Sequence, residues 1–405
     1  MTPRKRQLIF LWMYREWGGA QIYFLAIMKL AAAEWDITVI LPRDSSDDIV
    51  RYVKEAGATV EFLNTSLDVA QAVRFKRKIE RHVSRFKAER EVLQRLRKFD
   101  LKESILHVET APWQSWQFLT ILLLRGANVF VTLHNALPRY TRWREMIWML
   151  RMKFLSRFRG FHIFASNHDT RNRFRPFVTK RFWQNIPVTY TCVNPNEIDE
   201  ARRSEIDRSA ERRKLGLDDS FFVLCVGQFI DRKGRWIFLE AARDVVAADD
   251  NIRFAWLTPT PPTDADQTRV KSYGLGKKFR LALSLEIGPT RADILKFYRL
   301  ADVFALPSFV EGLPISLLEA MAMGLPSIST NINAIPEALR NEQNGILIEA
   351  GDSVALADAI LRLATDAQLR DRLGRQARED VIRDFDEREA SRIAIAAYEA
   401  CFADG

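Results

Sequence analysis

The sequence predicts an α/β protein made of two Rossmann-like, doubly wound domains. Short apolar runs alternate with helical stretches along the whole chain, which is typical of parallel sheets covered by helices on both faces. The chain has 405 residues, more than one core usually organises, so two domains are expected. Apolar residues make up 47% and charged residues 28%. This composition excludes a disordered or fibrous chain.

The first half of the chain reads as one such domain, which we place at residues 1–200. It opens with a strand, a Gly-rich turn, a helix and a second strand, at residues 8–13, 17–20, 21–33 and 37–41. Further buried strands are expected at residues 105–108, 129–133 and 161–166, each after a helical stretch.

The second half repeats the pattern, and we place this domain at residues 201–384. Strands are expected at residues 221–226, 254–257, 302–306 and 327–329, and helices at 236–246, 316–323 and 354–365. The polar, highly charged stretch 194–214 is the linker candidate, and the Pro- and Thr-rich stretch 259–266 reads as a loop.

Charge is distributed unevenly between the halves. The formal net charge is +9; residues 1–200 hold 33 Lys and Arg against 20 Asp and Glu, and residues 201–405 hold 28 against 32. A basic N-terminal half indicates an anionic partner, either nucleic acid or a membrane surface. Cys192, Cys225 and Cys401 lack metal-ligand or redox spacing and fit a reducing compartment. The apolar run after Arg4 is expected to be a buried strand and not a signal peptide, and no transmembrane helix is expected.

Two glutamates eight positions apart form the main motif, Glu311-Gly-Leu-Pro-Ile-Ser-Leu-Leu-Glu319. Gly312 and Pro314 predict a turn, and Ser316 is expected to cap the helix that follows. The N–H groups at a helix start can bind a phosphate, and both carboxylates can accept hydrogen bonds from one polyhydroxyl ligand. An acidic loop followed by a solvated helix explains the same spacing.

A second motif runs from Gly227 to Gly234. A strand ends at the first glycine, and Lys233 precedes the second, at the sheet edge where doubly wound folds bind ligands. A lysine at this edge can neutralise a diphosphate. The alternative is an ordinary connecting loop with exposed charges. Gly18 and Gly19, after the first strand, also permit close approach of a phosphate, although they fit a plain turn equally well.

His134 and Asn135 follow the strand at residues 129–133, so the imidazole is expected at the same kind of edge. A histidine that only stabilises a loop is the alternative. Asp264-Ala-Asp266 matches a metal-binding D-x-D pattern formally, but it lies in a Pro-rich loop and we expect no metal there.

In this order, the motifs resemble those of the retaining glycosyltransferases of family 4, which have the GT-B fold, two domains facing across a cleft. The resemblance is densest from Phe221 to about Asp384. It is carried by Ala301-Asp-Val-Phe-Ala-Leu-Pro-Ser308 and the segments 311–324, 331–337, 344–345 and 351–352.

The resemblance implies a role for each motif. Glu319 would hold the ribose of a nucleotide, Glu311 the transferred sugar, and Lys233 the departing diphosphate. His134 would contact the donor sugar near the reacting carbon, and residues 385–405 would form a helix that crosses back to the N-terminal domain. The expected catalytic residues are thus His134, Glu311 and Lys233, and the donor-binding residues are Gly18, Gly19, Gln228, Arg232, Lys233, Glu311, Gly312, Leu313, Ser316 and Glu319.

The sequence departs from the family at three places. Gln228 replaces a usual arginine, so Arg232 is expected to supply the charge. Ala334 replaces a usual glycine, and Trp256-Leu-Thr-Pro lacks the usual Gly-rich turn.

We therefore expect a retaining, metal-independent glycosyltransferase with no cofactor beyond its nucleotide-sugar co-substrate. Its acceptor is expected to be lipid-linked or an oligosaccharide, and its location cytoplasmic, on the inner face of the cell membrane. A nucleotide-sugar epimerase of the same fold, an inactive sugar-binding relative and a basic nucleic-acid-binding protein are the alternatives. No base-reading motif supports the last, so we expect no nucleic-acid partner.

An apolar stripe favours the membrane as partner. Its members fall at helical spacing and have basic neighbours: Trp143, Ile147, Leu150, Phe154, Phe158 and Phe161, flanked by Arg142, Arg144, Arg151, Lys153 and Arg157. A second basic segment, residues 74–98, carries Phe75, Ile79, Val83, Phe86, Leu93 and Leu96. Such stripes lie in lipid interfaces, or they pack on a core.

Overall fold

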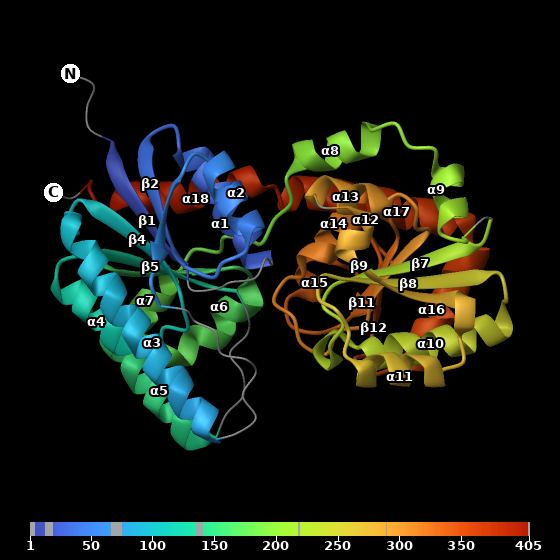
Figure 1. The fold of residues 1–405 in the computed structure, drawn as a ribbon, viewed down its shortest axis with the longest axis horizontal. Helices are drawn as coiled ribbons and strands as arrows, with labels where there is room; N and C mark the ends of the chain where they lie inside the picture. The colour runs from blue at the N-terminus through green and yellow to red at the C-terminus, as the bar shows by residue number, and fades with distance from the viewer. Residues whose placement is uncertain are drawn as a thin grey trace. The chain divides into compact units, whose positions relative to one another are not determined.

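Two α/β units make up the chain (Figure 1). The computed structural model describes residues 5–12, 19–65, 75–134, 141–217, 219–288 and 290–403, without the side chains of 19–20 and 75–82. Unit 1 comprises Met1–Thr191 with Glu387–Gly405, and unit 2 comprises Cys192–Asp386. Each unit is described by itself.

Unit 1 contains a six-stranded parallel sheet in the order β3-β2-β1-β4-β5-β6. This is the strand order of a Rossmann domain. The strands are β1 (Arg6–Trp12), β2 (Trp35–Pro42), β3 (Thr59–Leu63), β4 (Ser104–Glu109), β5 (Asn128–Leu133) and β6 (Phe161–Ala165). The helices are α1 (Gly19–Ala31), α2 (Asp47–Glu55), α3 (Phe75–Arg95), α4 (Trp116–Leu124), α5 (Arg142–Leu155), α6 (His168–Phe174), α7 (Lys180–Gln184) and α18 (Glu387–Ala400).

Unit 2 repeats this topology in its own parallel sheet, ordered β12-β11-β10-β7-β8-β9. The strands are β7 (Phe221–Val226), β8 (Ile252–Thr258), β9 (Phe279–Leu283), β10 (Val303–Leu306), β11 (Ser327–Thr330) and β12 (Ile346–Ile348). The helices are α8 (Pro195–Arg203), α9 (Arg208–Lys214), α10 (Arg235–Ala248), α11 (Asp264–Ser272), α12 (Ser284–Ile287), α13 (Arg291–Tyr298), α14 (Ile315–Met323), α15 (Ile335–Ala338), α16 (Ser353–Thr365) and α17 (Ala367–Asp384). The predicted fold class, two Rossmann-like domains, is confirmed.

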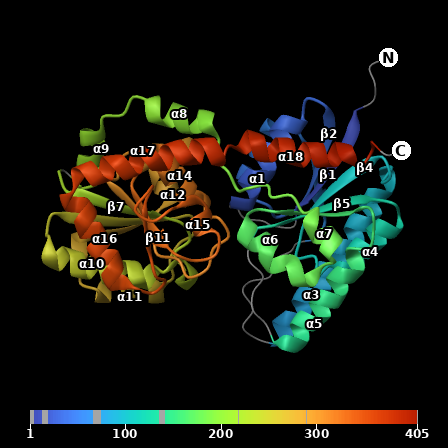
Figure 2. The same cartoon turned by 180° about the vertical axis from the view of Figure 1, so that it is seen from behind.

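Both faces of the first sheet are buried, which explains why its strands read as continuous apolar runs. Ile9 and Leu11 of β1 pack in one core with residues of α4 and α5. Phe10 and Trp12 point to the other face and pack with α1 and α18. Helix α18 packs against α1 (Figure 2), and the hydroxyl of its Tyr398 lies 2.6 Å from His107 Nδ1. Residues 387–400 thereby complete unit 1.

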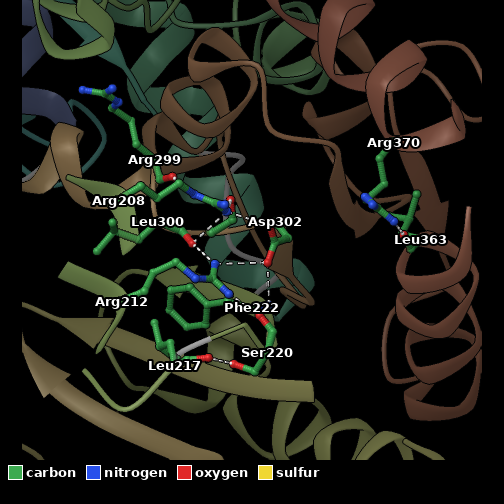
Figure 3. Close-up of polar contacts among 11 residues, drawn as sticks. Arg208, Arg212, Leu217, Ser220, Phe222, Arg299, Leu300, Asp302, Leu363 and Arg370 are labelled. Carbon is green, nitrogen blue, oxygen red and sulfur yellow. Dashed lines mark hydrogen bonds and ion pairs between the residues drawn. The ribbon is translucent and has the colours of Figure 1, made fainter. Parts of the chain in front are cut away.

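The predicted linker, residues 194–214, is wrong: this stretch forms α8 and α9 and belongs to unit 2. Arg212, almost fully buried, donates to the carbonyl of Leu300, to Asp302 and to the carbonyl of Ser220 (Figure 3). Arg208 adds a 2.7 Å contact to Asp302. Arginines that look solvated in the sequence therefore attach α9 to the sheet, and the unit boundary moves from residue 200 to Thr191.

Some elements were not predicted because they are short or polar. Strands β3, β9 and β12 lie at sheet edges. Burial is weaker along β3 and β9, and β12 has only three residues. The predicted loop 259–266 is wrong at its end, because Asp264 already begins α11. The second boundary also shifts, from residue 384 to Asp386.

The apolar stripe of residues 143–161 divides between surface and core. Helix α5 ends at Leu155, so Phe161 belongs to β6 and is buried. Ile147 and Phe158 pack against the core, whereas Trp143 and Leu150 are 66% and 60% exposed and Phe154 is exposed as well. The prediction of one continuous stripe is therefore wrong, because the side chains of Trp148, Met152 and Leu155 supply the buried face.

Helices α3 and α5 lie side by side (Figures 1 and 2). On α3, Val83 and Phe86 are exposed, Leu93 packs against the core and Leu96, just after the helix, is buried. The side chains of Phe75 and Ile79 lie outside the described set. In the described part of the chain, no helix has the length and apolar character to cross a bilayer.

Candidate functional site

Lys233 and Glu311 form an ion pair at the carboxyl edge of the second sheet. Lys233 follows β7 and Glu311 follows β10, the neighbouring strands at which the strand order reverses. Lys233 Nζ lies 2.6 Å from Glu311 Oε1, and the two side chains are 12% and 5% exposed. Doubly wound sheets bind ligands at this switch point. The structure thus brings two predicted catalytic residues together where a ligand is expected.

Further polar groups orient the Glu311 carboxylate. Ser308 Oγ donates to Oε1 over 2.7 Å, and Arg232 Nη1 lies 3.9 Å from Oε2. The backbone N–H of Glu311 donates to Asn333 Oδ1 over 3.3 Å. Ser308 ends the segment 301–308 on which the resemblance partly rests. The roles of Ser308 and Asn333 were not predicted, because a side chain that hydrogen-bonds a site residue need not lie at any fixed spacing from it in the sequence.

Gly234 allows the two loops to approach each other. Its backbone is left-handed, with φ of 75°, and a Cβ there would collide with the carbonyl oxygen of Pro307. The N–H of Phe309 also donates to the carbonyl of Arg232 over 2.8 Å. Only glycine fits both the dihedral angle and the close contact. This approach places Lys233 within reach of Glu311.

Two of the three departures from the expected pattern, at Trp256 and Ala334, have structural explanations, and Gln228 has none. Trp256 Nε1 donates to the carbonyl of Gly227 over 2.8 Å, so the indole supports the loop that leads to Lys233. Gln228, half-buried, accepts a hydrogen bond on its carbonyl from the N–H of Ile230. Ala334 has φ of −90°, a conformation in which alanine is unstrained.

Glu319 lies on α14 and is held by two groups of α13 that the sequence did not reveal. Arg291 Nη1 lies 2.5 Å from Oε1, and the Tyr298 hydroxyl donates to Oε2 over 3.0 Å. Arg291 also contacts Glu197 at 3.0 Å. Burial lowers the pKa of Arg291, but Glu319 and Glu197 outweigh burial and hold this pKa above its usual value. Burial, followed by the charge of Glu319, raises the pKa of Tyr298, so its hydroxyl stays protonated.

The predicted cap of α14 is wrong. Helix α14 begins at Ile315 with Pro314 in the N-cap position, and no side chain caps it. Ser316 is inside the first turn and buried, where its carbonyl accepts from the Tyr298 hydroxyl over 3.3 Å. Gly312 and Leu313 are buried just before the helix. Uncapped N–H groups at the helix start suit an anion.

The predicted residues of unit 1 form a separate group. His134 follows β5, and its Nε2 is buried without a hydrogen-bond partner among the described residues. Burial lowers the pKa of His134 to about 4, so the ring is neutral near pH 7. Gly19 begins α1, while Gly18 and Asn135 lie outside the described residues.

Asp266 has a structural role. With Thr263 it forms the capping box of α11, and it pairs with Arg235 at 2.8 Å. Within the described ranges, no group of three or more His, Cys, Asp or Glu side chains is arranged to hold a metal ion.

Part of the chain is similar in sequence to glycosyltransferases. Residues 207–380, within unit 2, match the family model described as glycosyl transferases group 1. The chain is 30% identical over 196 residues to "UDP-Gal:alpha-D-GlcNAc-diphosphoundecaprenol alpha-1,3-galactosyltransferase" of Escherichia coli, covering 48% of this chain and 50% of the relative. It is 31% identical over 195 residues to "Phosphatidyl-myo-inositol mannosyltransferase" of Mycobacterium leprae, covering 47% and 49%. The chain spans about half the length of the curated relatives it matches.

Structural comparisons cover nearly the whole chain. A glycosyltransferase from Rickettsia africae superposes with a TM-score of 0.77 at 15% identity, covering 99% of this chain and 100% of that one. The Anabaena protein HepE in complex with UDP-glucose superposes with a TM-score of 0.76 at 16% identity, covering 98% and 100%. At this identity the likeness establishes the fold, the two Rossmann-like domains of GT-B glycosyltransferases.

Proposed function

We propose that this protein is a glycosyltransferase that moves a sugar from a nucleotide-sugar donor to a lipid-linked or saccharide acceptor. The observation that carries the proposal is the buried Lys233–Glu311 pair at the switch point of unit 2, inside the segment that matches the glycosyl transferases group 1 model. Glycosyl transfer expels a nucleoside diphosphate, and a fixed cation at the site of developing charge stabilises that step.

Lys233 and Arg232 are assigned to the diphosphate. The Lys233 ammonium group has three donors and uses one on Glu311, so two remain for phosphate oxygens. Arg232 is 42% exposed and adds a second positive charge nearby. In this proposal the two side chains supply the positive charge that a divalent metal supplies in other transferases, so transfer proceeds without metal or cofactor.

Glu311 and Glu319 are assigned to hydroxyl groups of the donor. Each carboxylate oxygen has two lone pairs, so Glu319 can accept a ribose hydroxyl while Arg291 and Tyr298 hold it in place. Glu311, fixed by Ser308 and Lys233, would accept from the transferred sugar. We further propose retention of anomeric configuration, with the acceptor attacking from the leaving-group face. His134, neutral at pH 7, would hydrogen-bond the donor sugar.

A panel of nucleotides and nucleotide sugars tests the donor site. We expect one of UDP, GDP, ADP or TDP to stabilise the protein, by about 2.7 kcal/mol at 100 times its Kd. The matching nucleotide sugars would then be assayed for hydrolysis and for transfer to GlcNAc-diphospholipid, and the product anomer would be read by NMR with and without EDTA. Stabilisation by none of the nucleotides would refute the proposal, and a released epimer would favour the alternative reaction.

We propose that the acceptor is reached at an anionic membrane surface, on the cytoplasmic face. The exposed apolar side chains Val83, Phe86, Trp143, Leu150 and Phe154 lie on the adjacent helices α3 and α5. The exposed Arg142 begins α5, and the exposed Arg157 follows its end. Apolar insertion with basic side chains at the headgroups is the pattern of interfacial helices.

Flotation with liposomes containing anionic lipid tests this surface. Wild type is expected to float at low salt and a Trp143→Glu, Leu150→Glu variant to remain unbound. Val354, 63% exposed on α16 of unit 2, provides the matched control: Val354→Glu should float like wild type. Equal flotation of all three proteins, or of none, would contradict the assignment.

A further inference from the structure

Three neighbouring residues of unit 1 carry buried polar atoms that lack a hydrogen-bond partner within normal distance among the described residues: Trp12 Nε1, Glu109 Oε2 and His134 Nε2. The Trp12 indole still acts on the Glu109 carboxyl as a weak donor. Glu89, Trp113 and Thr170 of unit 1 carry further atoms of this kind. Trp12 and Glu109 are 1% and 6% exposed. The described side chains of unit 2 contain no such atom. Folded proteins pair nearly all buried polar groups, so a group of such atoms at one place favours a polar binding site there.

The three atoms gather at the carboxyl edge of the first sheet. Trp12 ends β1 and stands opposite Glu109, which ends β4. His134 follows the next strand, β5, on the same face as Thr132, whose hydroxyl lies 2.8 Å from His107. The ring of Phe24 on α1 lies 5.8 Å from Trp12 and 5.6 Å from His134, between ring centroids. Strand order reverses between β1 and β4, so the group lies at the switch point where doubly wound sheets bind ligands.

The chemistry of the group is that of neutral donors and acceptors. Burial raises the pKa of Glu109 to about 8, against a smaller opposing contribution from the Trp12 indole, so the carboxyl is protonated at neutral pH. The His134 ring is neutral as well. An indole N–H, a carboxylic acid and a neutral imidazole match a hydroxyl, which both donates and accepts. They offer no positive charge to a phosphate.

We infer that Trp12, Glu109 and His134 form a binding site for a sugar hydroxyl at the switch point of unit 1. The inference rests on the proposed function and extends it with two residues, Trp12 and Glu109, and with the class of group they bind. The hydroxyl belongs either to the transferred sugar of the donor or to the acceptor, because both present the same chemistry.

The indole N–H of Trp12 reports directly on this site. The chain has ten tryptophans, and loss of one ¹H–¹⁵N indole signal in Trp12→Phe assigns the Trp12 signal. A shift of this signal with UDP-glucose, UDP-galactose, UDP-N-acetylglucosamine or GDP-mannose, but not with UDP or GDP, would support binding of the donor sugar. A shift only with short-chain GlcNAc-diphospholipid would support binding of the acceptor.

No shift with any of these probes, while a nucleotide still raises the melting temperature, would overturn the inference and leave the proposed function standing. If no nucleotide raises the melting temperature, the proposed function fails, and the inference fails with it. The two failures are therefore distinguishable in the same samples.

Variants of Glu109 separate binding from structure. Glu109→Leu removes a buried carboxyl whose Oε2 has no partner within normal distance. The variant is expected to fold with unchanged or higher stability, but to raise the KM of one substrate at least about tenfold. Glu109→Gln keeps a donor and an acceptor and should restore most of that loss. Glu91, whose carboxylate accepts from Asn64, Thr65 and Arg95, is the matched control. Glu91→Leu should lower stability with unchanged KM, and a Glu109→Leu protein with wild-type KM for both substrates would overturn the inference.

Discussion

Replacing Lys233 by alanine removes a cation from the buried pair at the switch point of unit 2. A hydrogen bond between charged groups contributes about 1.5–3 kcal/mol. Loss of the Lys233 contacts to a diphosphate should therefore weaken nucleotide binding by about 10- to 150-fold. Calorimetric titration with the nucleoside diphosphate that most stabilises wild type measures this change in Kd.

The same substitution should destabilise unit 2, because Glu311 loses the ammonium group 2.6 Å away and is only 5% exposed. Removing one partner of a buried pair costs about 3–5 kcal/mol. Glu311 keeps the Ser308 hydroxyl, with Arg232 at 3.9 Å, so a cost of about 2–4 kcal/mol is expected. For a unit of this size, that lowers its melting temperature by roughly 4–16 °C.

A double substitution separates the two effects. In Lys233→Ala, Glu311→Ala the unpaired carboxylate is absent, so stability should partly recover while nucleotide affinity stays low. Lys278, which pairs with Asp250 at 2.6 Å before β9, is the matched control. Lys278→Ala should leave Kd unchanged. If Lys233→Ala also binds the nucleotide within twofold of wild type, the assignment of Lys233 to the diphosphate is wrong.

Four further changes have defined outcomes. Gly234→Ala forces a Cβ against the Pro307 carbonyl in a left-handed conformation, so thermal melts should show several kcal/mol of lost stability, or no folded unit 2. Arg212→Leu removes a buried donor from the carbonyls of Ser220 and Leu300 and should cost about 2–4 kcal/mol in denaturant melts; a change below 0.5 kcal/mol would show that α9 is not attached through this side chain. His134→Ala should lower turnover while nucleotide Kd stays near wild type, and wild-type turnover would exclude the catalytic role. The pKa of Glu109 rises from 4.5 to about 8 on folding, so its proton stabilises unit 1 fully below pH 4.5, and this stabilisation is lost as the pH rises through 8. Glu109→Gln should abolish this part of the pH dependence of stability. Parallel curves of stability against pH for wild type and variant would contradict the prediction.

Much of the fold was predictable because the central strands are buried on both faces. The strand at Phe221–Val226 was predicted with its observed bounds, since such a strand must be almost wholly apolar. The edge strands escaped prediction for other reasons: β3 and β9 are less buried and carry polar residues, and β12 is apolar but only three residues long. The stretch 194–214 was wrongly predicted as a linker for the opposite reason. An arginine such as Arg212 is expected in solvent, yet this side chain is buried because the carbonyls of Leu300 and Ser220 and the carboxylate of Asp302 accept from its guanidinium.

The candidate site also has a part that was predictable from the sequence and a part that was not. Lys233, Glu311 and Glu319 were predictable, since glycines, turns and helix starts fix where their backbone lies. Their partners were not: Arg291 reaches Glu319 from a helix 28 positions earlier in the chain, and Asn333 reaches Glu311 from 22 positions later. Contacts between distant segments depend on strand order and register, which leave no local spacing in the sequence.

The sequence by itself determined the two doubly wound domains, the glutamate pair and the lysine at the sheet edge, because burial and backbone conformation act on neighbouring residues. Only the tertiary structure decided that Lys233 pairs with Glu311 and that Glu109 meets Trp12 at a second switch point. A buried carboxyl has no signature in the sequence. Whether a polar side chain is buried, and what it faces, depends on the strands on either side of it.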